Sequence, residues 1–226
     1  MNEKKALQRR ERAKKHGLPQ YTFGEELFNS ITHGFGAVAS LVGLIFLVLK
    51  AQGAQNIASV VIFSVSSIAL YTVSCVYHGM HVSAAKKYLR IADHCSIFLM
   101  IGGCSTPFIF MVLDGWVQIA VLIGIWVTGI TGITLNLIDL KRFSKLSMAC
   151  YIIMGWFLVG AMPVLIRELE RNALILLFAG GLCYTVGAVV YALGKKLKVP
   201  YVHTFYHFLI LAGTALHYAM VYIYMI

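Results

Sequence analysis

Residues 173–193 read ALILLFAGGLCYTVGAVVYAL, an apolar run without a single charged side chain. A helix of about 20 apolar residues is long enough to cross the hydrocarbon core of a bilayer, where the backbone must satisfy its own hydrogen bonds. Six further runs of similar character lie at 34–50, 56–77, 94–113, 115–136, 146–166 and 204–225. The sequence therefore predicts an all-α, polytopic membrane protein with seven transmembrane helices.

The composition agrees with a membrane environment for most of the chain. Of its 226 residues, 59% are hydrophobic and 12% are charged, whereas about a quarter of a soluble domain is charged. The formal charge of +10 comes from basic residues between the apolar runs and not from a folded basic face, so we expect no nucleic acid partner. The five cysteines lie inside apolar runs without CxxC spacing, which favours packing over a disulfide framework.

Lysine and arginine are distributed unevenly over the two sides of the predicted spans. Sixteen of the nineteen lie on the side of the amino terminus, and the exceptions are Lys50, Arg167 and Arg171. Short loops that carry positive charge remain in the cytoplasm during insertion. We therefore predict a cytoplasmic amino terminus and, after an odd number of spans, a carboxyl terminus outside.

The chain divides into a basic arm and one membrane domain. Residues 1–20 have dense charge and no aromatic residue, and we expect a flexible cytoplasmic arm that either rests on anionic lipid head groups or serves topology alone. Residues 21–226 form a single seven-helix transmembrane domain. Within it, Pro107 and Pro163 fall inside spans and are expected to kink them.

Ionisable and polar side chains gather at one boundary of the predicted membrane domain. Ser74 and His78 end the second span, Asp93 opens the third, and His203 and His207 begin the seventh. Such groups are costly in a bilayer unless they are paired or ligated. In the predicted topology all of them lie at the cytoplasmic face, which indicates a functional site there.

The residue types at this boundary suit a catalytic zinc site. Residues four apart share a helix face, so His203 and His207 can ligate one metal, with His78 as a third nitrogen. Zinc held in this way lowers the pKa of a bound water to ~7. Asp93 is then a candidate general base, and Ser74 can position the water or stabilise an oxyanion. Taken singly, the histidine pair suits an interface, Asp93 a helix N-cap, and Ser74 a bond to its own helix.

Further polar residues lie in the first and the seventh span or next to them. Glu25, Asn29 and His33 follow at steps of four and share a helical stripe, where they either cap the first helix or help to close the site. His217 lies deeper in the seventh span, and we expect a hydrogen-bonded core histidine there.

Four segments resemble one membrane protein family. They are EELFNSITHGFGA at 25–37, SCVYH at 74–78, RIADHCSIF at 90–98 and HTFYH at 203–207. In these segments the chain resembles the hemolysin III branch of the progestin and adipoQ receptor family, which belongs to a wider group that includes the alkaline ceramidases. The resemblance implies seven spans in the bacterial cytoplasmic membrane and a zinc ion on His78, His203 and His207, with water held towards Asp93 and Ser74 close by.

The resemblance also implies lipid-amide hydrolysis, with ceramide-like substrates entering sideways from the bilayer. We therefore expect a zinc-dependent hydrolase of lipid amide or ester bonds. One alternative is a receptor or signalling protein whose zinc is structural and ties the second and seventh helices together. Another is a membrane-lytic, hemolysin-like protein, although an ion pathway normally places ionisable groups near mid-membrane and not at one edge.

Overall fold

The computed structural model describes residues 3–226, and this part of the chain is helical without strands. Seven helical segments are long and apolar enough to cross a membrane, which confirms the predicted fold class. Six of them are single helices: α2 (Phe23–Lys50), α3 (Ala54–Gly79), α4 (Ala84–Met111), α5 (Gly115–Asp139), α8 (Arg171–Leu197) and α9 (Val202–Tyr224). The fifth span combines α6 (Ser144–Trp156), the 3₁₀ turn η1 (Phe157–Ala161) and α7 (Met162–Glu168).

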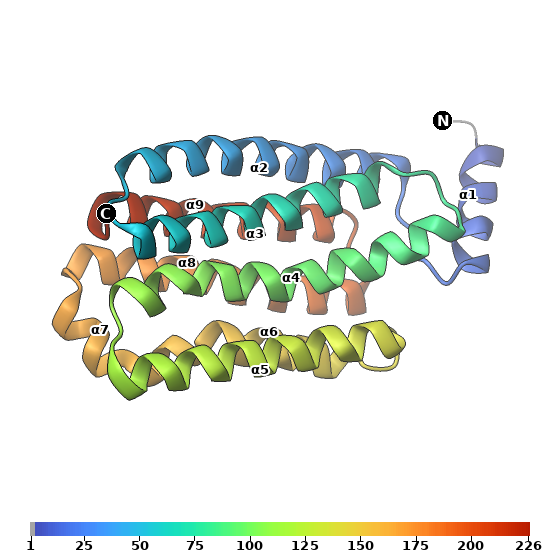
Figure 1. The fold of residues 1–226 in the computed structure, drawn as a ribbon. Helices are drawn as coiled ribbons and strands as arrows, with labels where there is room; N and C mark the ends of the chain where they lie inside the picture. Colours follow the sequence, from blue (N-terminus) through green and yellow to red (C-terminus); the bar gives the residue numbers. More distant parts are fainter. Residues whose placement is uncertain (1–2) are drawn as a thin grey trace.

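The spans form a bundle of roughly parallel and antiparallel helices (Figure 1). Helix α3 packs between α2 and α4, while α9 packs against α8 and α2. The two ends of the chain lie at opposite ends of the bundle, as an odd number of spans requires (Figure 1). Which end faces the cytoplasm stays a prediction from the distribution of basic residues.

The basic arm contains a helix, where we had expected a flexible segment. Helix α1 (Glu3–Lys15) crosses one end of the bundle at a steep angle to the spans (Figure 1). Its sequence is rich in Lys, Arg, Ala, Leu, Gln and Glu, all of which favour helix. The buried side chains of Ala13 and Leu18 and an ion pair of 3.3 Å between Arg9 and Glu26 hold the arm against the bundle.

Two spans begin earlier than their apolar runs indicate. Helix α2 starts at Phe23 behind a capping box, in which the Glu25 amide donates to the Thr22 hydroxyl at 3.2 Å and the Thr22 amide donates to the Glu25 carboxylate at 2.7 Å. Helix α4 starts at Ala84 with Ser83 as its N-cap. Asp93 therefore lies inside α4, and its interpretation as a helix cap is wrong.

The two prolines behave differently. Pro163 stands in the first turn of α7, directly after the 3₁₀ turn that interrupts the fifth span. A proline fits the first turn of a helix because its missing N–H would be unbonded there. Pro107, in contrast, lies inside α4, which continues to Met111. The helix of the fifth span is thus interrupted just before Pro163, whereas α4 continues through Pro107.

Close packing between α4 and α5 depends on a glycine, which has no side chain. A Cβ atom at Gly132 would lie 2.0 Å from Cζ of Phe98, a ring that is 1% exposed. We expect Gly132→Ala to lower the free energy of unfolding by about 1–3 kcal/mol, because the buried ring cannot move without displacing its neighbours. Thermal unfolding of the purified protein in detergent measures this loss.

Gly155→Ala is the matched control, since a Cβ at that position meets no atom within 4 Å. Equal melting temperatures for the two variants would contradict the account of this helix contact.

Candidate metal centre at one end of the bundle

Three histidines from two helices converge at the end of the bundle that α1 crosses. His78 comes from the last turn of α3, and His203 and His207 come from the first turns of α9. The Nε2 atom of His203 lies 3.2 Å from Nε2 of His78 and 3.2 Å from Nε2 of His207. Because one nitrogen from each ring lies within 4.8 Å of the others, the group can hold a metal ion.

The opposite nitrogens of two rings have protein partners. Nδ1 of His78 lies 2.7 Å from the Glu26 carboxylate, and Nδ1 of His207 lies 3.2 Å from the Thr32 hydroxyl. A carboxylate only accepts hydrogen bonds, so His78 donates from Nδ1 and keeps its lone pair on Nε2. Metal-bound histidines are oriented in this way in proteins, and the donor set therefore fits a zinc ion.

Glu26 is the centre of a buried ionic network. Its carboxylate accepts from Lys86 Nζ at 2.7 Å and pairs with Arg9 of α1 at 3.3 Å. Lys86 is 1% exposed and also donates to the backbone oxygens of His78 and Met80. The network therefore connects α1, α2, α3 and α4 around one imidazole.

Asp93 and Ser74 lie beside His78, as the sequence suggested. Both side chains are buried, and the Asp93 carboxyl lies within electrostatic range of the Ser74 hydroxyl and of His78. Neither residue belongs to the group whose atoms converge for a metal ion. The structure thus brings all five predicted residues together, and the roles of Asp93 and Ser74 remain predictions.

The three residues of the polar stripe on α2, Glu25, Asn29 and His33, make different contacts. Glu25 caps the helix and accepts from the Tyr201 amide at 3.0 Å, whereas Asn29 accepts from the Thr204 hydroxyl at 2.6 Å. His33 stacks on His207 with ring centroids 3.5 Å apart. Glu25 is therefore the capping residue, whereas Asn29 and His33 contact α9 beside the histidine cluster.

Sequence reasoning placed Glu26 in the same polar segment as Glu25, Asn29 and His33, but it did not connect Glu26 or Lys86 with the histidines. A stripe drawn through residues 26, 29 and 33 instead of 25, 29 and 33 would have included the glutamate, because steps of three also share a helix face. Lys86 was counted only as a topological charge.

Aromatic rings cover the cluster. Tyr21, which precedes α2, stacks on His203 with centroids 5.3 Å apart, and Tyr206 stacks on the same ring at 5.7 Å. Burial raises the pKa of the Tyr21 phenol, so this ring stays neutral beside the histidines. The first residue of the membrane domain thus contributes directly to the site.

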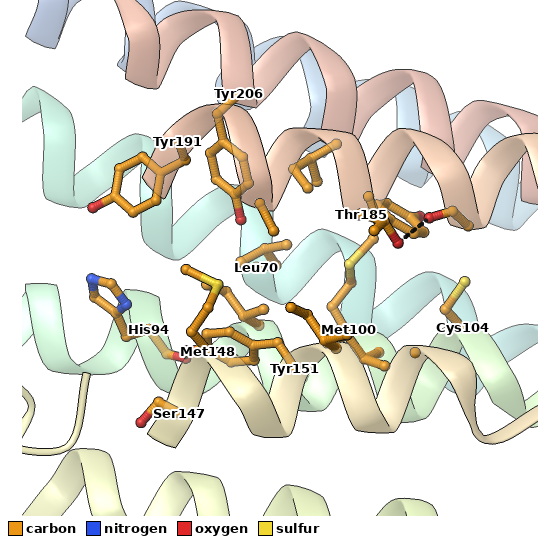
Figure 2. A pocket seen from close by; sticks show the side chains of 18 of the residues that line it. Leu70, His94, Met100, Cys104, Ser147, Met148, Tyr151, Thr185, Tyr191 and Tyr206 are labelled. Atoms are coloured by element: carbon orange, nitrogen blue, oxygen red, sulfur yellow. Dashed lines mark hydrogen bonds between the residues drawn. The ribbon is translucent and has the colours of Figure 1, made fainter. Parts of the chain in front are cut away.

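A cavity of about 740 Å³ leads away from the histidines between α3, α4, α6, α8 and α9. Figure 2 shows Leu70, Met100 and Tyr206 from three of these helices pointing into the same space. The cavity also reaches His217, ten residues beyond His207 in the chain and thus about 15 Å farther along the helix. Its walls are mainly apolar, as is usual for a small-molecule pocket.

His217 is a hydrogen-bonded core histidine, which confirms the prediction for this residue. Its Nε2 lies 3.1 Å from the Leu177 backbone oxygen and therefore donates, which leaves Nδ1 to accept from the Cys104 thiol at 2.9 Å.

The comparisons with known proteins agree with this arrangement. A family model described as "Haemolysin-III related" matches residues 21–218. The chain belongs to the haemolysin-III family. It is 37% identical over 205 residues to "Hemolysin-3" of Bacillus cereus, which covers 89% of this chain and 92% of that protein. It is 35% identical over 198 residues to "Hemolysin-3 homolog" of Bacillus subtilis (strain 168), covering 86% of this chain and 92% of that protein.

A more distant relative is the human "Monocyte to macrophage differentiation factor", 25% identical over 223 residues, which cover 95% of this chain and 90% of that protein. Together with the seven apolar helices, these relatives identify a multi-pass protein of the bacterial inner membrane and confirm the family resemblance found in the sequence.

We predict that Glu26→Gln weakens zinc binding about 10- to 100-fold, because His78 loses the charge that fixes its ring and raises its basicity. Competition with a chelator of known affinity, on protein purified in detergent, measures the change. Glu25→Gln is the control, since the Glu25 carboxylate caps α2 and accepts from the Tyr201 amide. Equal zinc affinity for Glu26→Gln and the native protein would refute this role.

Proposed function

We propose that this protein is a zinc-dependent membrane hydrolase that cleaves an amide or ester bond of a lipid. The observation that carries the proposal is the position of the histidine cluster at the polar end of a long apolar cavity. A lipid has the same division, because its polar group adjoins a hydrocarbon chain. Three imidazole nitrogens are a typical ligand set for zinc, whereas magnesium and calcium prefer oxygen ligands.

A zinc ion on His78, His203 and His207 would polarise the carbonyl group of the lipid and lower the pKa of a water to ~7. The protein supplies the remaining chemistry. Asp93 accepts a proton from the attacking water and returns it to the departing nitrogen or oxygen of the lipid. Ser74, which lies beside Asp93, either holds the water in place or turns its one hydroxyl proton from Asp93 to the developing oxyanion.

The position of Asp93 supports its proposed role. The carboxyl is 8% exposed and lies on the wall of the cavity, next to His78. A base in such a dry environment acts more strongly on a bound reactant than a solvated one does. Glu26, in contrast, already has three cationic or imidazole partners and is therefore a positioning residue.

The cavity wall between α6 and α8 supports entry of the lipid from the bilayer. Ile152 and Trp156 line the cavity and are 39% and 37% exposed, so neither side chain is closely covered by its neighbours. The Trp156 indole donates to the Thr185 hydroxyl at 3.1 Å across this wall.

Turnover of lipid amides and esters by the purified, zinc-loaded protein tests the proposal. Asp93→Asn should lower the rate about 10²- to 10⁴-fold, as removal of a general base does. Ser105→Ala is the control, because Ser105 also lines the cavity but donates to the Ile101 backbone oxygen. Absence of turnover across a broad lipid panel, or full activity of Asp93→Asn, would contradict the proposal.

A structural zinc site in a receptor-type protein is the second candidate. It is favoured by the placement of the ligands on α3 and α9, which one ion would tie together. In that case, removal of zinc with a chelator lowers the melting temperature strongly and no lipid is turned over, because the ion contributes directly to folding. Thermal unfolding with and without zinc, combined with the turnover assay, separates the two candidates.

A further inference from the structure

His33 is a buried histidine that the proposed hydrolysis leaves without a task. It lies on α2, is 3% exposed and lines the cavity beside the cluster. Neither Nδ1 nor Nε2 has a hydrogen-bond partner among residues 3–226. His217 lines the same cavity, but both of its ring nitrogens are paired.

Neighbouring rings hold His33 in a fixed orientation. Its imidazole stacks on that of His207 with centroids 3.5 Å apart and planes 10° apart, and it meets Tyr71 edge-on at 5.0 Å. A buried polar group without a partner lowers stability, and such groups are rare in native proteins. His33 is kept in place by packing on the wall of a ligand-sized cavity, so a ligand atom is the partner that its two buried nitrogens lack among the described residues.

The stacking shows where that ligand atom lies. The N–H bond and the lone pair of an imidazole both lie in the ring plane. A metal bound by His207 lies near the plane of the His207 ring, whereas a partner of His33 lies near a parallel plane 3.5 Å away. One ion cannot lie in both planes, so His33 is not a further ligand of the same metal. The offset is a distance that two or three covalent bonds span.

We propose that His33 binds a second polar atom of the lipid, two or three bonds from the carbonyl oxygen that faces His78, His203 and His207. A hydroxyl group on the carbon next to the carbonyl fits this position. A hydroxyl both donates and accepts, so it pairs with either tautomer of the imidazole. The inference rests on the proposed function insofar as it places the carbonyl end of the lipid at the histidine cluster.

The test uses two probes that differ only in this hydroxyl group, 2-hydroxyoleic acid and oleic acid. Binding to the purified, zinc-loaded protein is measured by titration calorimetry in nanodiscs. The native protein should bind the hydroxylated probe about fivefold to tenfold more tightly, as one hydrogen bond to a buried partner allows. His33→Phe keeps a ring for stacking on His207 but loses both nitrogens, so it should bind the two probes equally.

His217→Phe is the matched control and should keep the native preference, because His217 bonds only to Cys104 and Leu177 among the described residues. A purely structural effect of His33→Phe would weaken both probes alike and leave their ratio unchanged. An unchanged ratio in His33→Phe, or no preference in the native protein, would overturn the inference. Loss of the preference without any lipid turnover would support the role of His33 and count against hydrolysis alone.

Discussion

The pairing of the Glu26 carboxylate is the interaction on which the candidate metal centre depends. A buried charge at a membrane boundary is tolerated only with partners, and Glu26 has them on three other segments: Arg9 on α1, His78 on α3 and Lys86 on α4. These contacts fix α2 against its neighbours and orient the imidazole of His78. The helix ends and the ligand geometry are therefore set by the same carboxylate.

The second organising feature is the contrast between the two ends of the cavity. Histidines, Asp93 and Ser74 form one end, and mainly apolar side chains, many of them from α4, α6 and α8, line the rest. Tyr21 closes the polar end from the side of the arm by stacking on His203. A polar end joined to an apolar body matches a lipid better than it matches a water-soluble substrate.

The features that could be predicted from the sequence are those that follow from short-range patterns, namely the apolar spans and the spacing of the histidines. Apolar runs predicted the seven spans. The spacing of four residues predicted that the rings of His203 and His207 lie on one helix face and can reach the same metal ion. The early starts of α2 and α4 were missed, because polar residues such as Glu26 and Lys86 can lie in helices when they are paired. That pairing joins residues 60 positions apart, and no local pattern reveals it.

The cavity and the stacked His33 depend on how the helices pack, which the sequence does not display. The same holds for α1, since composition alone suggested a flexible arm. Its helix is held in place by contacts of Arg9 and Ala13 with the folded bundle. Tertiary contacts thus decided the features that local propensity left open.

The central claim is that the three histidines hold zinc, and metal analysis by mass spectrometry tests it most directly. The native protein, purified in detergent, is compared with the double variant His203→Ala, His207→Ala. The account predicts about one zinc ion per chain in the native protein and its loss in the double variant. Well-folded native protein that binds no metal even after zinc is added back would contradict the account.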